Sequence, residues 1–134
     1  MPRIRRDFLR DRAGGRCEYC HFPERFLAAG LTLDHVIAQQ HRGGDGEENL
    51  AMACLHCNAC KGPNIASMDW QSSQVVRLFN PRLDRWDDHF QIVEDRIEGR
   101  TPEGRATVML LDMNNAANVS LRELLRRSGM GIGA

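Results

Sequence analysis

The chain has 134 residues, of which 42% are hydrophobic and 27% charged, and its 18 basic and 18 acidic side chains cancel to a net charge of zero. This composition is typical of one globular domain and excludes a disordered or fibrous protein. The zero net charge argues against strong non-specific binding to polyanions, and no apolar run reaches the roughly 18 residues of a membrane span.

The N-terminal residues and the cysteine content favour the cytoplasm as the compartment. The first residues, MPRIRRDFLRDR, lack the apolar core of a secretory signal. We therefore expect a soluble, cytoplasmic protein without a membrane partner. In a reducing cytosol, five cysteines are better explained as metal ligands or buried thiols than as a disulfide framework.

The first half of the chain contains signals for a helix followed by a hairpin. Residues 2–13 have helix-forming composition, with Ile4, Phe8 and Leu9 near one face and a stop at residues 14–15, which are both glycine. CEYC at 17–20 is a tight turn, and LTLDHVI at 31–37 has the alternation of a strand. RGGDGEE at 42–48 is predicted to be a loop and NLAMAC the returning strand. A helix is then expected from about Asn58, which Gly62-Pro63 would shorten or bend.

The second half, from about residue 75, reads as packing scaffold. VVRLFNP and FQIVEDRIEG have strand character. Thr101 is expected to cap a helix with Pro102 at its first position. The run SLRE, from Ser120 to Glu123, is expected to open a short final helix that ends at Gly129. Trp70, Trp86 and Phe90 are expected to fill the core. We predict one α+β domain over residues 1–134.

Two Cys-x-x-Cys pairs predict a metal site. Cys17 with Cys20 and Cys54 with Cys57 provide four thiolates, which suit tetrahedral Zn²⁺. The alternative is a set of buried, unligated thiols. Cys60 is left over and is interpreted as a bystander.

The residues between and after these pairs carry a family resemblance. Asp34-His35 lies on the first predicted strand, Asn49 begins the second, and Asn58 follows the last zinc cysteine. This ordered set, within LDHVIAQQHRGG and ENLAMACLHCNACKGPNI, resembles the HNH (ββα-metal, or His-Me finger) endonuclease motif in its His-Asn-Asn variant, over about residues 16–69. LFNPRLDRWDDHF and GRTPEGRATV also resemble the tail of small stand-alone members. The resemblance implies a zinc-stabilised ββα-metal core with an N-terminal helix and a strand-plus-helix extension over about residues 75–134.

The resemblance also implies a role for each residue of the set. His35 would activate water as the general base, while Asp34 and Asn58 would hold one Mg²⁺ or Mn²⁺ ion. Asn49 would brace the loop that carries the histidine, and the zinc ion would be purely structural. Adjacent residues of a strand point to opposite faces, so Asp34 and His35 can serve one site only where the strand ends or bulges.

Four further residues are candidates for contact with nucleic acid. Lys61 lies one helical turn past Asn58 and is either a phosphate contact or a solvated surface lysine. His41 and Arg5 are candidate substrate contacts, and Asn64 either supports the metal loop or contacts the substrate. His56, inside the second cysteine turn, is expected to face solvent.

We interpret the sequence as a metal-dependent endonuclease that hydrolyses phosphodiester bonds in DNA, by nicking or with weak specificity. RNA remains open as a substrate, and the chain would act as a monomer or homodimer. The alternative is a zinc-ribbon module that binds nucleic acid without cutting it. A redox protein using its Cys-x-x-Cys pairs is a third interpretation, which the interposed acid and base disfavour.

Overall fold

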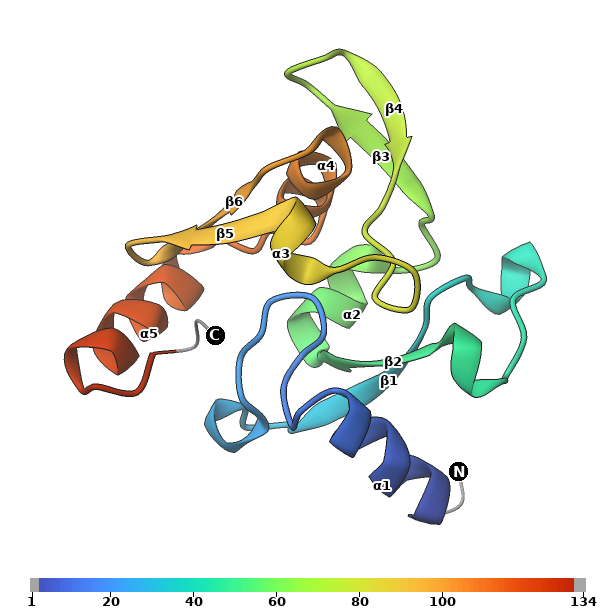
Figure 1. Ribbon diagram of the computed structural model, residues 1–134, viewed down its shortest axis with the longest axis horizontal. Coiled ribbons are helices and arrows are strands. Elements are labelled where there is room, and N and C mark those ends of the chain that lie inside the picture. The colour runs from blue at the N-terminus through green and yellow to red at the C-terminus, as the bar shows by residue number, and fades with distance from the viewer. Residues whose placement is uncertain (1–2, 132–134) are drawn as a thin grey trace.

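The computed structural model describes residues 3–131, in which six short strands form three hairpins that are joined and covered by helices (Figure 1). The elements in chain order are α1 (Arg3–Arg12), β1 (Leu31–His35), β2 (Leu50–Cys54), α2 (Leu55–Lys61), β3 (Ala66–Asp69), β4 (Gln74–Arg77), α3 (Trp86–His89), β5 (Phe90–Val93), β6 (Arg96–Gly99), α4 (Pro102–Leu110) and α5 (Ala116–Arg127). No helix within residues 3–131 has the length and apolar character needed to cross a membrane.

The first hairpin and the helix after it form the centre of the fold. β1 pairs with β2 in antiparallel register, so that His35 lies opposite Leu50 and Leu31 opposite Cys54. Every residue of β2 is buried, because the strand lies between α1, α2 and the N-terminal cysteine turn. The succession β1, β2, α2 confirms the predicted ββα core within an α+β fold.

Helix α2 begins earlier than the sequence predicts. It starts at Leu55 instead of near Asn58, because Cys54 caps it: the Cys54 Sγ accepts a hydrogen bond from the Cys57 backbone nitrogen at 3.3 Å. Asn58 therefore lies in the middle of the helix. The helix ends at Lys61, before Gly62 with a φ of 52°, as the Gly-Pro pair predicts.

The N-terminal helix packs on the hairpin through a narrow face. Leu9 is fully buried, whereas Phe8 is 46% exposed, so only one of these two residues, expected near one face of the helix, lies in the core. The side chain of Ile4 lies outside the described residues. At the end of α1, Arg12 donates to the carbonyl oxygens of Glu47 and Leu50, which ties the helix to the start of β2.

The C-terminal extension is a second layer built on α4. This helix packs against β3 and β6, and its predicted cap is confirmed, since Thr101 Oγ1 accepts from the Gly104 nitrogen at 3.0 Å. The last helix differs from the prediction: it begins at Ala116 with Asn115 as its cap, so Ser120 lies inside it. The run from Ser120 to Glu123, which was expected to open the helix, instead continues a helix that Asn115 caps five residues before Ser120.

One of the three aromatic residues expected in the core lies outside it. Phe90 is 1% exposed and Trp86 packs against the core at intermediate exposure. Trp70, in contrast, is 68% exposed in the turn after β3. The turn is fixed by Asp69, whose carboxylate accepts from Ser72 and from Arg105 of α4, and this leaves the indole outside the packed layer.

Candidate active site and metal centre

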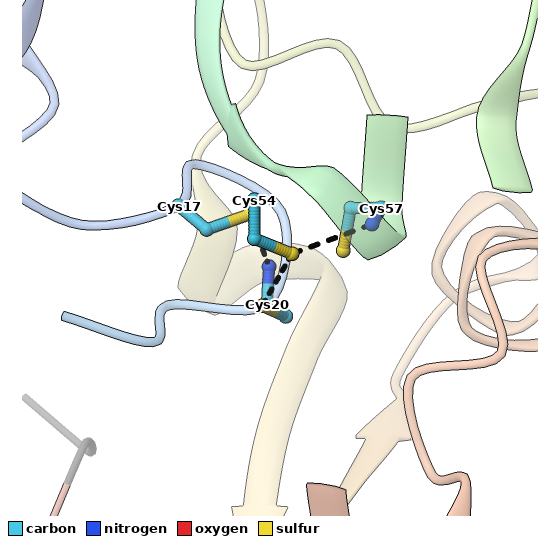
Figure 2. Close-up of side chains that lie close together, drawn as sticks. All are labelled: Cys17, Cys20, Cys54 and Cys57. Atoms are coloured by element: carbon cyan, nitrogen blue, oxygen red, sulfur yellow. Dashed lines mark hydrogen bonds between the residues drawn. The ribbon is translucent and has the colours of Figure 1, made fainter. Parts of the chain in front are cut away.

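Four cysteines converge between the N-terminal turn, the end of β2 and the start of α2 (Figure 2). Cys17, Cys20 and Cys57 are fully buried and Cys54 is 3% exposed. Their Sγ atoms all lie within 4.8 Å of one another, and those of Cys20 and Cys54 are 3.7 Å apart. Zn–S bonds of about 2.3 Å in a tetrahedron place sulfurs about 3.8 Å apart, so this cluster is positioned to form a zinc site, as predicted.

The charges of the cluster point to a cation as well. Hydrogen bonds from the Cys17 and Cys20 thiols lower the pKa of Cys54. Four thiolates this close, out of contact with water, would repel one another without a positive ion among them. A zinc ion bound here would connect the 17–20 turn to the β2–α2 junction and would hold the helix against the hairpin.

Cys60 and His56 lie outside the cluster, where they contact each other and His56 also contacts the chain after α4. Cys60 is partly buried, with its Sγ 3.7 Å from the His56 Nε2. The same Nε2 lies 2.9 Å from the carbonyl oxygen of Leu111 and 3.0 Å from that of Asp112. The expectation that His56 faces solvent is therefore wrong. Its ring binds α2 to the chain after α4, because both carbonyl oxygens lie within hydrogen-bond distance of Nε2.

His35 is the last residue of β1, and its ring is held from the following loop. Its Nε2 lies 2.9 Å from Asp45 Oδ1, which also accepts from the side chain of Gln39 at 3.2 Å. These hydrogen bonds lower the pKa of Asp45. When Nε2–H donates to Asp45, Nδ1 carries the free lone pair and can accept a proton. Sequence reasoning missed Asp45, which stands in a glycine-rich stretch that we interpreted only as a loop.

Asn49 fixes the loop between His35 and Asp45. Its Nδ2 donates to the carbonyl oxygens of Ile37 at 2.9 Å and Gly44 at 2.8 Å, and its Oδ1 accepts from the Ile37 nitrogen at 2.9 Å. Gly43 permits this approach, since a Cβ there would lie 1.7 Å from the Ile37 oxygen. One side chain therefore saturates three backbone groups of the loop that positions the imidazole.

Asp34 points away from His35, into the protein. It is 4% exposed; its Oδ2 accepts from the Tyr19 hydroxyl at 2.6 Å and its Oδ1 from Lys61 Nζ at 3.2 Å. Burial raises the pKa of Asp34, and Lys61 and Tyr19 oppose that rise. Burial and the neighbouring carboxylate raise the pKa of Tyr19 well above its ordinary value. Tyr19 was also missed, because it occupies a variable position of the Cys-x-x-Cys turn.

Lys61 is a buried residue of the site. It is 1% exposed, so the expectation of a solvated surface lysine is wrong. Besides Asp34, its Nζ donates to the backbone oxygen of His35 at 3.2 Å. The ammonium group therefore joins α2 to the end of β1 directly behind the histidine. A contact between Lys61 and phosphate would require the side chain to leave this position.

Asn58 faces the same side of β1 as Asp34. Its Nδ2 donates to Thr32 Oγ1 at 2.9 Å and approaches the Leu33 oxygen at 3.4 Å. Thr32 and Asp34 alternate on one face of the strand, and α2 covers that face. The structure thus brings Asp34 and Asn58 to one β1–α2 interface. No hydrogen bond among the described residues joins their side chains to the His35 ring, which faces the loop at the point where β1 ends.

The carboxylate and amide of this interface are donor types that suit a hard divalent cation such as Mg²⁺ or Mn²⁺. Both carboxylate oxygens of Asp34 already accept hydrogen bonds, one of them from the Lys61 ammonium. Each oxygen keeps a further lone pair, so a divalent ion at Oδ1 would lie close to the Lys61 ammonium and would either share that oxygen with Nζ or displace it.

The other candidate substrate contacts lie at the surface around the hairpin. His41 is exposed in the loop after β1, and Arg5 of α1 is partly exposed and close enough to help lower the pKa of Asp45. Asn64 is exposed and donates to the Lys61 carbonyl oxygen at 3.0 Å, which closes the end of α2. Thus His41 and Arg5 flank the His35 loop, and Asn64 lies at the opposite end of α2 from the cysteines.

Comparison with known proteins identifies the central segment. Residues 17–64 match the family model of the HNH endonucleases. The matched segment runs from the first zinc cysteine to the end of the loop after α2, and it contains every residue of the metal cluster and the β1–α2 interface. Searches of curated proteins and of solved structures gave no match.

Proposed function

We propose that this protein is a DNA endonuclease that hydrolyses phosphodiester bonds, by nicking or with weak specificity, because residues 17–64 match the family model of the HNH endonucleases. The observation that carries the proposal is the His35 ring, held by Asp45 at 2.9 Å on a loop that Asn49 braces. A fixed imidazole with one free nitrogen at the protein surface is what general-base catalysis requires.

The chain's own residues divide the work of the reaction. His35 Nδ1 takes the proton of the attacking water, and Asp45 stabilises the imidazolium that results, because a carboxylate favours the charged ring. Asn49 keeps the loop from shifting during this step. A divalent cation held by Asp34 and Asn58 would supply neutralisation of the scissile phosphate and of the leaving oxygen. Zinc held by the four cysteines would keep these segments together and would take no part in the chemistry.

A plasmid-nicking assay tests the proposal. Wild-type protein should nick supercoiled plasmid in the presence of Mg²⁺ or Mn²⁺, and His35→Ala should lose this activity while it keeps one zinc ion per chain and the circular dichroism of the wild type. Cys60→Ser, which changes a residue near the site but outside the zinc cluster, is the matched control and should nick normally. Equal nicking by His35→Ala and wild type would refute the assignment of the base.

One observation favours a second function. Lys61 and Tyr19 satisfy both oxygens of Asp34 without a metal, as expected of a zinc-stabilised module that binds nucleic acid without cleaving it. This module would bind DNA but leave plasmid intact at every concentration of Mg²⁺ and Mn²⁺, whereas the endonuclease would nick it and lose activity on chelation of the divalent ion.

A further inference from the structure

Helix α5 places a buried cation close to the first cysteine turn. Arg122 of this helix is 3% exposed, and its Cζ lies 5.2 Å from the centre of the Phe22 ring. Phe22 follows Cys20 by two residues, and its carbonyl oxygen accepts from the Cys17 nitrogen at 3.0 Å. Because the HNH match ends at residue 64, this arginine belongs to the C-terminal extension and lies outside the matched segment.

The guanidinium of Arg122 has only neutral hydrogen-bond partners. Its terminal nitrogens donate to the carbonyl oxygens of Met113 at 2.5 Å and Asp95 at 3.2 Å, and to the side-chain oxygen of Asn114 at 3.2 Å. Its Nε is buried and makes no hydrogen bond within the described residues. The Asp95 carboxylate pairs with Arg126 instead, at 2.8 and 3.0 Å. A buried positive charge is unfavourable unless an anion compensates it, so an anion is expected elsewhere near Arg122.

The cysteine cluster has the opposite excess of charge. Four thiolates around one Zn²⁺ ion leave two negative charges uncompensated in a buried position. Hydrogen bonds from backbone nitrogens reach the first cysteine of each pair: those of Tyr19 and Cys20 donate to Cys17 Sγ at 3.4 Å, and that of Cys57 donates to Cys54 Sγ at 3.3 Å. Such hydrogen bonds stabilise a thiolate. Further positive charge is therefore most useful at the second cysteine of each pair.

Those second cysteines are the ones that interact with Arg122. Burial lowers the pKa of Arg122, and negative charge on Cys20 and Cys57 opposes this more than any other group does. Cysteines must be deprotonated to bind zinc, so both negative charges are present whenever zinc is bound. The buried cation without a carboxylate partner and the buried anionic cluster thus compensate each other.

We infer that Arg122 is the counter-charge of the zinc-bound thiolates and that it tightens the binding of zinc. Arg122 touches neither the ion nor the reacting atoms, so it is a positioning residue that acts through Cys20 and Cys57. Residues that support metal ligands from behind commonly change metal affinity about 10–100-fold. The inference makes α5 part of the zinc centre, although the helix supplies no ligand, and it holds whether or not the protein cleaves DNA.

Zinc affinity, measured by competition with a chromogenic chelator, tests this role. Arg122→Met replaces the guanidinium by an apolar side chain and should weaken zinc binding about 10–100-fold. Arg122→Lys keeps the charge but loses most of the hydrogen bonds, and it should recover most of the lost affinity. Arg127→Met is the matched control, because Arg127 lies on the same helix but is exposed and pairs with Glu123. This control should bind zinc as tightly as wild type.

The comparison of lysine with methionine separates a charge from an anchor. An arginine that only ties α5 down by its hydrogen bonds would be replaced no better by lysine than by methionine. Equal losses of zinc affinity in Arg122→Lys and Arg122→Met would therefore overturn the inference, and so would wild-type affinity in Arg122→Met. If Arg122→Met does not fold in excess zinc, Arg122→Gln takes its place in the same comparison, since its neutral amide can still donate to the Met113 oxygen.

Discussion

Replacement of Lys61 by methionine tests the buried ion pair on which the β1–α2 interface depends. Lys61 is 1% exposed and Asp34 4%, with 3.2 Å between Nζ and Oδ1. Methionine fills most of the space of the lysine stem but carries no charge. Asp34 would keep its carboxylate in a buried position with only the Tyr19 hydroxyl as a partner. Loss of one member of a buried pair costs about 3–5 kcal/mol of unfolding free energy, and we expect a loss of this size.

Most of this loss of unfolding free energy should come from leaving the buried Asp34 carboxylate without its cationic partner, and much less from the lost attraction between Asp34 and Lys61. Asp34→Asn removes that charge but keeps an oxygen that can accept from Tyr19. We therefore expect the double variant Asp34→Asn, Lys61→Met to be more stable than Lys61→Met alone, with a coupling free energy of about 2 kcal/mol. Urea unfolding in excess zinc of the wild type, Asp34→Asn, Lys61→Met and the double variant measures this double-mutant cycle, provided that the four proteins have equal m-values. A loss below about 1 kcal/mol in Lys61→Met, with no recovery in the double variant, would refute the reasoning.

The same substitution has a consequence for the proposed cation site. Lys61 and a divalent ion compete for Asp34 Oδ1, and an ammonium group about 4 Å away opposes a second cation by several kcal/mol even with partial screening. Lys61→Met should therefore bind Mn²⁺ about tenfold more tightly or better than wild type, as measured by titration of the free-ion signal in electron paramagnetic resonance. Equal affinities would place the ion elsewhere.

Three further predictions concern residues around the site. Cys57→Ser should lose zinc and unfold, since structural zinc contributes directly to folding, whereas Cys60→Ser should keep one zinc ion per chain by metal analysis. Asn49→Ala removes three hydrogen bonds, so it should lower the unfolding free energy by about 1–3 kcal/mol and slow nicking; an unchanged rate would show that the loop needs no brace. His56→Ala should speed amide exchange in residues 111–115 without loss of zinc, and unchanged exchange would contradict the link from α2 to that segment.

Local patterns predicted much of the fold because they depend on neighbouring residues. The alternation in LTLDHVI and the stop at Gly62-Pro63 predicted β1 and the end of α2, and Thr101 predicted the start of α4. The failures share a cause. Which residue caps a helix depends on how the chain packs as a whole. Cys54 caps α2 and Asn115 caps α5, so these helices begin before Asn58 and Ser120, where the sequence predicted their starts. Strand β3, which carries weak propensity, forms because it pairs with β4 and packs on α4.

The sequence by itself determined which cysteines can bind a metal and which family the central segment resembles. Each Cys-x-x-Cys turn presents its two sulfurs to one ion by local geometry, and the ordered Asp-His, Asn and Asn set between and after the two turns is enough to predict the HNH endonuclease family, whose model residues 17–64 match. Only the tertiary structure decided which partners those side chains have. The contacts of Asp45 with His35, and of Tyr19 and Lys61 with Asp34, depend on the meeting of segments that are separate in the sequence, since burial and charge pairing are properties of the packed chain.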